Sequence, residues 1–408
     1  MNTHQSWLKP RNEYLQRLIT FREKMLIKVV TGVRRSGKST LFALYIDYLR
    51  QQGVREDQII SINLDELEYE ELLTYRYLYS YISERLPKDR YTYIFIDEVQ
   101  QCKGFEKAVN SLYIKDNVDI YITGSNARLL SGELATLLSG RYVEIQMLPL
   151  SFREYLTFIH GNNESLTTSF IRYMQDGSFP YIPMLNREEQ AVKGYIEGIY
   201  NTILVKDVAI RKGITDISVL EQIVRFLGSA IGSPISAKKI ADTIASTGRK
   251  ISVNTVDTYL KALVDSYIFY KVDRFDIKGK NFLKTLGKYY IVDLGLRNTL
   301  LVSSEPDTGH QIENIVYLEL LRRGYSVSIG KVGEREVDFV AIRQKKISYY
   351  QVSATVLDER TLRRELAPLQ AITDNYPKTL LTLDEIGAGN TYGGIVQKNL
   401  LQWLTEDV

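Results

Sequence analysis

The sequence predicts an α/β protein whose N-terminal part is a doubly wound parallel sheet, and three observations carry this prediction. Short β-branched or apolar runs alternate with helical patterns through the first 150 residues. One run, residues 93–96, is nearly all apolar, as in a strand covered on both faces. A glycine-containing segment at residues 32–39 joins the first run to the first helical pattern. Strands that alternate with helices make right-handed crossovers, which produce a parallel sheet.

The expected elements of this N-terminal part follow one another closely. Apolar periodicity separates the strands from the helices. The predicted strands are 26–31, 59–64, 93–96, 118–123 and 142–146, and the predicted helices are 38–51, 69–86 and 104–114. Beyond Pro149 the pattern is helical to about residue 213.

The rest of the chain divides at a polar, turn-rich stretch, residues 302–309. Before it, three helices and two strands follow the order of a winged helix-turn-helix. These are a helix from 218, helices 236–245 and 252–266, and strands 268–274 and 289–292. After it we expect helices 311–323 and 359–373 and strands 325–330, 337–342, 348–352 and 378–382. The sequence therefore predicts four parts, 1–150, 151–215, 216–301 and 309–408.

Length and composition exclude several classes of protein. A chain of 408 residues is too long for a single core, and 44% hydrophobic with 25% charged residues is ordinary for a globular protein. No apolar run approaches the ~18 residues that a membrane span needs, and the polar N-terminus has no secretory signal. The single cysteine, Cys102, indicates a reducing compartment. We therefore expect a cytoplasmic protein without membrane contact.

The segment GVRRSGKS at residues 32–39 has the spacing of a phosphate-binding loop. Glycines let successive amide groups point at phosphate oxygens, and the following helix adds its N-terminal partial charge. Lys38 would reach the β- and γ-phosphates, and Ser39 would bind Mg²⁺. A glycine turn beside a surface lysine would explain the residue pattern by itself, but it would not explain the strand that precedes the pattern and the helix that follows it. The predicted ligands are ATP and Mg²⁺, and the candidate binding residues are Gly32, Val33, Arg34, Arg35, Ser36, Gly37, Lys38, Ser39 and Thr40.

Polar residues at the ends of later strands complete this candidate site. Asp97 and Glu98 end an apolar strand at the carboxyl edge of the sheet, where ligands of such sheets bind. Asp97 would hold Mg²⁺ through water, and Glu98 would orient and deprotonate the attacking water. Ser125 and Asn126 follow the next strand and fit either phosphate sensing or a simple turn. Arg141 could reach its own site, reach a neighbour's site, or form a surface ion pair.

A basic excess lies between residues 245 and 290, where nine Lys and Arg face four Asp, a net charge of +5. Lys238 and Lys239 precede it. This excess fits either a solvated surface or a face that binds a polyanion. The candidate nucleic-acid contacts are Lys238, Lys239, Arg249, Lys250, Lys278, Lys280 and Lys284.

Motifs spread along the chain resemble one known family. GVRRSGKST, YIFIDEVQ, ITGSNARLLSG, DGSFPY, YYIVDLGLRN and EVDFVAIRQKKISYYQVS are similar to prokaryotic AAA+ superfamily ATPases that carry a C-terminal domain of unknown function. The resemblance implies an AAA+ core, a helical lid, a winged helix and a C-terminal fold like PD-(D/E)xK nucleases. It also implies a homo-oligomer, either a ring or another assembly, with ATP at subunit interfaces. Under the resemblance, Ser125 or Asn126 is the sensor, and Arg141 and Arg211 are the candidate phosphate-sensing arginines.

The C-terminal part departs from the nuclease pattern that the resemblance implies. Asp338 and Glu313 or Glu319 match the expected acids, but Gln351 and Ser353 stand where an acid and a lysine are expected. Asp338 could equally form an ion pair with Arg335 or Arg343. We therefore expect a relic site at Glu313, Asp338 and Gln351 that does not cut.

Three functions are consistent with the sequence. The preferred one is an oligomeric ATPase that binds and remodels or translocates nucleic acid, DNA rather than RNA. The second is an ATP-gated, metal-dependent nuclease, against which Gln351 and Ser353 argue. The third is an ATP-driven switch that grips a protein partner.

Overall fold

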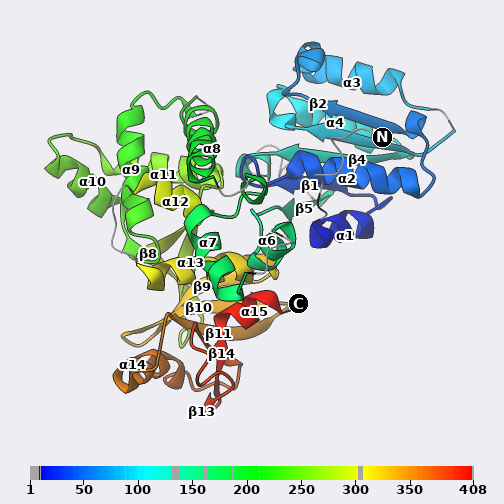
Figure 1. Ribbon diagram of the computed structural model, residues 1–408. Coiled ribbons are helices and arrows are strands. Elements are labelled where there is room, and N and C mark those ends of the chain that lie inside the picture. Colours follow the sequence, from blue (N-terminus) through cyan, green and yellow to red (C-terminus); the bar gives the residue numbers. More distant parts are fainter. Residues whose placement is uncertain are drawn as a thin grey trace. The chain divides into compact units, whose positions relative to one another are not determined.

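The structure is a computed structural model, and its chain divides into two compact units (Figure 1). Unit 1 comprises residues 1–149 with 265–267, and unit 2 comprises 150–264 with 268–408. The residues described are 9, 11–87, 89–130, 138, 140–159, 164–185, 188–210, 212–301 and 307–406, without the side chains of 128, 130, 284 and 285.

Unit 1 is built on a five-stranded sheet in which every neighbouring pair is parallel. The strand order is β2 (Ile59–Asn63), β3 (Thr92–Asp97), β4 (Val118–Gly124), β1 (Ile27–Thr31) and β5 (Tyr142–Gln146). The predicted parallel sheet is therefore confirmed, and each strand lies within two residues of its expected position.

Helices cover both faces of this sheet, as Figure 1 shows. α1 (Asn12–Thr20) and α2 (Lys38–Gln51) pack on the face that carries Val30 and Phe95. α3 (Tyr75–Glu84) and α4 (Phe105–Tyr113) pack on the face that carries Val29 and Ile96. Successive strand residues point to opposite faces, so an apolar run fills both cores at once. The doubly wound arrangement follows from these continuous apolar strands.

The predicted helix at 69–86 is interrupted. A 3-10 segment, Leu67–Leu72, comes first, and α3 begins only at Tyr75. Thr74 between them is extended, with φ −124° and ψ 144°, and forms an isolated parallel bridge with Lys103. This backbone pairing replaces the helical hydrogen bonds that periodicity alone predicted.

Unit 2 contains many helices and one long sheet. The helices are α6 (Phe152–Phe158), α7 (Leu166–Asp176), α8 (Glu189–Thr202), a π-helix (Ile203–Ile210), α9 (Ile217–Ser229), α10 (Ala237–Ser246), α11 (Val253–Asp265), α12 (Leu294–Leu300), α13 (Thr308–Arg322), α14 (Glu359–Gln370) and α15 (Leu400–Thr405). Among the described residues, no helix is long and apolar enough to cross a membrane.

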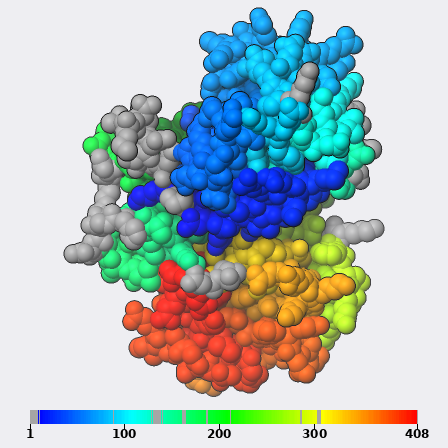
Figure 2. All heavy atoms as spheres, turned by 90° about the vertical axis from the view of Figure 1, so that its right-hand side faces the viewer, coloured from blue at the N-terminus to red at the C-terminus, as the bar shows by residue number. Residues whose placement is uncertain are grey.

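The nine strands of unit 2 form a single mixed sheet. Their order is β13 (Thr391–Tyr392), β14 (Ile395–Asn399), β12 (Lys378–Thr382), β11 (Lys346–Ser353), β10 (Arg335–Arg343), β9 (Ser326–Val332), β7 (Phe269–Asp276), β8 (Asn281–Ile291) and β6 (Pro234–Ile235). β7 pairs in parallel with β9 through Arg274, Phe275 and Asp276. In the space-filling view the orange and red segments of this unit form one body (Figure 2). The sheet thus runs without a break through the two parts expected at 216–301 and 309–408.

Within this sheet, the strands β6, β7 and β8 belong to the segment expected to be a winged helix. α9, β6, α10, α11, β7 and β8 follow one another in sequence, and β8 pairs with both β6 and β7. β7 and β8 are longer than predicted, because they continue past a register shift between Val272 and Arg274. The element order agrees with the expectation, and the winged-helix assignment itself stays a prediction.

Two of the motifs outside the glycine loop contact each other. Asp293, the N-cap of α12, is buried and accepts hydrogen bonds from Ser178 N at 2.5 Å and Ser178 Oγ at 2.7 Å. A Cβ atom on Gly177 would lie 2.4 Å from Asp293 Oδ1, so only glycine fits there. DGSFPY and VDLGLRN therefore form a packing joint within unit 2, which explains their residue types without a ligand.

Candidate functional site

The glycine loop turns sharply between β1 and α2. Gly32 and Gly37 have φ values of 141° and 98°, a region that favours glycine. A Cβ atom on Gly32 would lie 2.1 Å from the Met147 carbonyl oxygen. Arg35 also has positive φ, 67°, although it carries a side chain. The loop therefore leads directly from the carboxyl end of β1 into the N-terminus of α2, where an anion is favoured.

Lys38, the first residue of α2, folds its side chain back over this loop. Its Nζ donates to the Gly32 and Val33 carbonyl oxygens, each at 3.1 Å, and lies 3.9 Å from Glu98 Oε1. The side chain is only 4% exposed. A buried ammonium needs such partners, since an uncompensated charge is costly inside a protein. Lys38 and Glu98 are thus brought together, as expected.

Asp97 ends β3 at the same edge, among hydroxyl groups. Thr123 Oγ1 at the end of β4 donates to Asp97 Oδ1, and Ser39 hydrogen-bonds to the same carboxylate. Burial raises the pKa of the Asp97 carboxyl above its usual value, and the hydrogen bonds from Ser39 and Thr123 oppose that rise. A carboxylate beside a serine hydroxyl is the oxygen-only ligand set that Mg²⁺ prefers, so these residues fit the ion.

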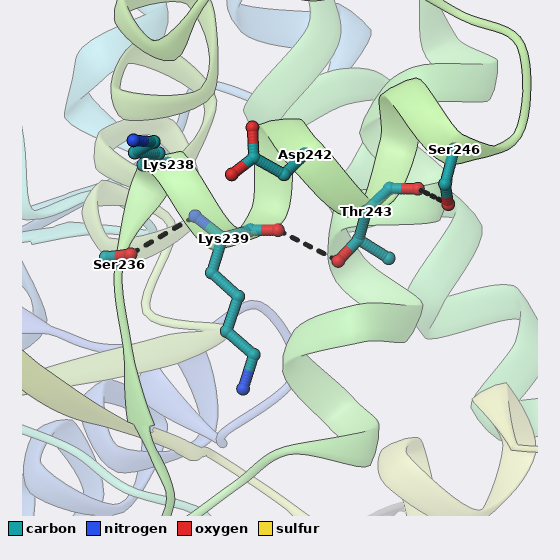
Figure 3. A pocket seen from close by; sticks show the side chains of 6 residues that line it. All are labelled: Ser236, Lys238, Lys239, Asp242, Thr243 and Ser246. Atoms are coloured by element: carbon teal, nitrogen blue, oxygen red, sulfur yellow. Dashed lines mark hydrogen bonds between the residues drawn. The ribbon is translucent and has the colours of Figure 1, made fainter.

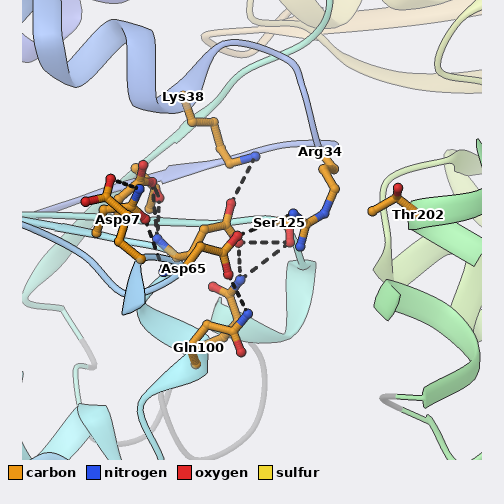
Figure 4. Close-up of polar contacts among 12 residues, drawn as sticks. Arg34, Lys38, Asp65, Asp97, Gln100, Ser125 and Thr202 are labelled. Atoms are coloured by element: carbon orange, nitrogen blue, oxygen red, sulfur yellow. Dashed lines mark hydrogen bonds and ion pairs between the residues drawn. The ribbon is translucent and has the colours of Figure 1, made fainter. Parts of the chain in front are cut away.

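Glu98 follows in a left-handed backbone conformation, with φ 50° and ψ 46°. Its amide donates to Thr123 Oγ1 at 2.9 Å, and its Oε2 accepts from Ser125 Oγ at 3.3 Å. Asn126 is buried next in the chain, 2% exposed. Figure 4 shows Lys38, Gln100 and Ser125 within one network of polar contacts. Ser125 is therefore close enough to influence Glu98, and the predicted strand-end cluster is assembled at one edge.

Arg34 lies at the outer side of the loop, where its NH1 is 3.4 Å from Asp65 Oδ2 (Figure 4). Asp65 also accepts from Gln101 Nε2 at 2.8 Å. Asp65 follows β2, and no signal in the sequence marked it as part of the site. Thr40, half-buried, lies in the first turn of α2 beside Ser39.

Arg141 lies at the amino-terminal ends of β1 and β5, whereas the glycine loop lies at the carboxyl end of β1. Its carbonyl accepts from Ile27 N, at the start of β1, and NH1 donates to Asn110 Oδ1 at 2.9 Å. The guanidinium also lies over the Tyr113 ring, 5.6 Å from its centroid. A five-residue strand is about 16 Å long, so Arg141 is too far away to reach the phosphates of its own loop. Arg211 lies outside the described residues.

Arg11 contributes to this site and was not predicted. It is 4% exposed, and its NH1 donates to Ser36 O at 3.1 Å and Leu148 O at 2.7 Å. NH2 donates to Pro149 O at 3.2 Å. Arg11 thereby ties the glycine loop to the segment after β5. These partners are 25 to 138 residues away in sequence, so no local pattern could indicate them.

Comparison with known proteins identifies the chain's relatives. Residues 24–156 match the family described as an AAA domain. A Haemophilus influenzae protein named only as uncharacterised is 42% identical over 375 residues, which cover 91% of this chain and 92% of that protein. The chain belongs to this family of AAA-domain proteins. An uncharacterised protein of Methanocaldococcus jannaschii is 30% identical over 385 residues, 88% of this chain and 83% of its own.

A solved structure supports the fold of the AAA domain. The Walker-type ATPase of Pyrococcus abyssi superposes with a TM-score of 0.51 at 16% identity, over 71% of this chain and 95% of that one. Together with the family match, this likeness confirms the P-loop ATPase fold. Residues 167–307 match a domain of unknown function (DUF8612), a description that names neither a winged helix nor a nuclease. Those two assignments therefore stay predictions.

A shallow hollow of about 480 Å³ lies beside α10 in unit 2 of this AAA-domain protein. Its lining comes from α10 and its N-cap: Ser236, Lys238, Lys239, Asp242, Thr243 and Ser246 (Figure 3). Lys238 and Lys239 are exposed there, and the Ser236 hydroxyl caps the helix by accepting from Lys239 N. The two lysines thus stand near a helix N-terminus, which also attracts anions.

The other basic candidates have different surroundings. Lys250, Lys278 and Lys280 are exposed, the last two on the turn between β7 and β8. Arg249 NH1 instead donates to Ser218 Oγ at 2.9 Å and lies 3.6 Å from Asp216. The side chain of Lys284 lies outside the described residues.

Lys288, counted in the basic excess, is buried and cannot contact nucleic acid. Its Nζ lies 2.9 Å from both Glu313 Oε1 and Glu336 Oε1. Tyr290 OH also donates to Glu313 Oε1, at 2.6 Å. β8 therefore supplies a cation beside Glu313, fifty residues upstream of Asp338, which the sequence did not indicate.

Asp338 lies buried beside this cluster. Its Oδ2 accepts from Val352 N at 2.8 Å, and burial together with Glu313 raises the pKa of its carboxyl well above the usual value. Gln351 donates to Glu365 Oε2 at 2.9 Å, whereas Glu319 pairs with Arg322 and Arg323.

The rival ion pairs of Asp338 do not form. Arg335 donates to the Ala367 carbonyl and Arg343 to the Arg323 carbonyl. Within the described ranges, no group of three or more His, Cys, Asp or Glu side chains could hold a metal ion.

Proposed function

We propose that this protein is an AAA+ ATPase that hydrolyses ATP with Mg²⁺ and couples hydrolysis to binding and remodelling of nucleic acid. One observation carries the proposal. Lys38, Ser39, Asp97 and Glu98 converge at the carboxyl edge of the sheet, around a loop whose approach to the Met147 carbonyl leaves no room for a side chain at Gly32.

Nucleotide binding draws on groups that are already in place. Lys38 exchanges the Gly32 and Val33 carbonyls for the β- and γ-phosphates, which carry full negative charge. The N-terminus of α2 adds its partial positive charge. Ser39 and Asp97 would hold Mg²⁺, which neutralises phosphate charge when bound. Arg34 lies at the outer rim of the loop.

Hydrolysis draws on Glu98. Its carboxylate lies across the loop from Lys38 and accepts a proton from the attacking water as that water approaches the γ-phosphorus. Ser125 and Asn126, behind Glu98, are the proposed sensor groups, because Ser125 already contacts the carboxylate. Positioning and charge neutralisation supply most of the rate in such reactions.

Arg141 is proposed to act on a neighbouring subunit. Its exposed guanidinium is held by Asn110 and Tyr113 at the edge remote from its own loop. An arginine supplied in trans stabilises charge on the transferring phosphoryl group. This placement supports a homo-oligomer, ring-shaped as the resemblance implies, and Arg211 is the alternative residue for the role.

Unit 2 is proposed to bind the DNA backbone. Arg249 and Lys288 form ion pairs with acidic side chains. The exposed cations that carry the proposal are Lys238 and Lys239 beside the hollow, together with Lys250, Lys278 and Lys280. Phosphate groups are the natural partners of exposed lysines near a helix N-terminus. The C-terminal part is proposed to keep a nuclease-like shape without cutting, because Gln351 brings no negative charge to hold a metal ion beside Asp338.

Steady-state ATPase assays test the whole proposal. Hydrolysis should require Mg²⁺ and should accelerate with single-stranded, duplex or branched DNA. A rate that no nucleic acid changes, together with acceleration by a protein partner, would replace DNA by a protein as the ligand of unit 2. Cleavage of DNA by the wild type that disappears in Asp338→Ala would instead establish the ATP-gated nuclease.

A further inference from the structure

Gln100 contacts the Glu98 carboxylate from the short turn that follows β3. It lies in the 3-10 turn Val99–Gln101, and its Nε2 donates to Glu98 Oε2. The same nitrogen lies 3.5 Å from Ser125 Oγ, which itself donates to Glu98 Oε2. One carboxylate oxygen thus carries two donors, while Oε1 faces the Lys38 ammonium (Figure 4).

The orientation of the Gln100 amide is fixed by its surroundings. Only the nitrogen of a carboxamide can donate to a carboxylate, so Nε2 must face Glu98. Oε1 is buried and accepts no hydrogen bond from any described residue. It lies against Gly124, where a Cβ atom would be 2.6 Å from Oε1. The glycine therefore leaves space that the Leu129 side chain and the Gln100 amide share, and a larger residue would displace both.

The backbone of Glu98 brings Gln100 into this position. The left-handed conformation of Glu98 is uncommon for a residue with a side chain. It reverses the chain after β3, so that a residue two positions later reaches back to the carboxylate. Strained conformations of this kind persist where surrounding contacts hold them.

We infer that Gln100 is a positioning residue for Glu98 in ATP hydrolysis, an inference that rests on the function proposed above. Gln100 and Ser125 occupy Oε2, which leaves Oε1 to accept the proton of the attacking water. The water oxygen then bonds to the γ-phosphorus, and the bond from that phosphorus to the bridging oxygen of ADP breaks. Gln100 acts through Glu98, because neither of its amide atoms contacts the glycine loop in the described structure.

Two substitutions separate positioning from nucleotide binding. Gln100→Ala removes the donor, and Gln100→Glu keeps the size of the side chain while removing the donor as well. Both should lower single-turnover hydrolysis by about 10- to 100-fold, because a base displaced by 1 Å loses that much. The Kd of a fluorescent ATP analogue should change by less than about twofold. Gln51→Ala, an exposed glutamine at the C-terminal end of α2, is the control and should hydrolyse like the wild type.

A double-mutant cycle with Glu98→Gln measures whether Gln100 acts through Glu98. Gln100→Ala should cost less than about twofold in the residual rate of Glu98→Gln, because its partner is already inactive. Wild-type hydrolysis by Glu98→Gln would refute the proposed base, and the inference would fail with it. An inactive Glu98→Gln together with a fully active Gln100→Ala, or equal losses of Gln100→Ala in both backgrounds, would overturn the inference on Gln100 alone.

Discussion

Lys38 Nζ lies 3.9 Å from Glu98 Oε1 and 3.1 Å from each of two carbonyl oxygens of its own loop. The ammonium thus has oxygen partners on three sides, two from the loop and one from Glu98. The proposed function assigns this ammonium to nucleotide binding and assigns Glu98 to the chemical step alone.

Substitutions at these two positions should separate binding from hydrolysis. Lys38→Ala should weaken ATP binding by about 100-fold or more, because a charge-assisted contact to phosphate is lost. Glu98→Gln should bind ATP normally and hydrolyse it about 100-fold more slowly, because an amide cannot accept the proton of water. Nucleotide titration and phosphate release measure the two effects. Equal loss of binding in both variants would contradict the assignment.

Arg141 should serve a neighbouring subunit. Arg141→Ala alone should lower the hydrolysis rate by about 1,000-fold, as expected for an arginine that contacts transferring phosphate. A mixture with Lys38→Ala subunits should recover activity, because the second variant supplies the missing arginine to an intact loop. Arg76→Ala, an exposed arginine beside Tyr75, is the control. The same mixing experiment with Arg211→Ala decides between the two arginines, and loss proportional to the mutant fraction in both mixtures would exclude a shared site.

The exposed lysines of unit 2 should set the salt dependence of DNA binding. Each of the double reversals Lys238→Glu with Lys239→Glu, and Lys278→Glu with Lys280→Glu, should reduce the slope of log affinity against log salt by about 2. Basal ATPase should not change. Reversal of the exposed pair Lys345, on the turn between β10 and β11, and Lys346, the first residue of β11, is a charge-matched control. Equal effects of all three pairs would indicate attraction by net charge alone, without a binding face.

Arg11 should stabilise unit 1 through the loop. Arg11→Ala leaves three carbonyl oxygens without their cationic donor and should lower the free energy of unfolding by about 2 to 4 kcal/mol. Gln16→Ala, exposed on the neighbouring helix α1, should change it by less than about 0.5 kcal/mol. Urea denaturation measures both. ATP should restore part of the loss, since bound ligand adds stability in proportion to its affinity.

Cys102 should report on the opening of the turn that carries Gln100. Burial raises the pKa of the Cys102 thiol to about 12, from an ordinary value of 9.0. Because thiolate is the reactive form, a disulfide reagent at about pH 8 should modify the native protein about 1,000-fold more slowly than the unfolded chain. The native rate should rise with pH until it passes the raised pKa. Rapid labelling of the native protein would show that the turn opens freely.

The sequence predicted the AAA core well because its signals are local. Each signal lies within a short segment: the residues of the glycine loop, the strand before Lys38, and the acids after residue 96. The parallel topology then brings the carboxyl ends of these strands to one edge of the sheet. Arg11, Gln100 and Lys288 were missed, because their partners are set by tertiary packing or by side-chain direction. Lys288 looked like one member of a basic surface, yet its contacts come from Glu313 and Glu336 on other elements.

The pairing of β7 with β9 constrains how this protein can evolve. If the chain were divided near residue 307, where the match to the domain of unknown function ends, β7 and β9 would be separated. Each strand would then expose an unpaired edge to water. Such edges pair with other chains and aggregate. The strands of this sheet are therefore expected to be inherited together, and the match to the Haemophilus influenzae relative, which covers 91% of this chain, is longer than either part alone.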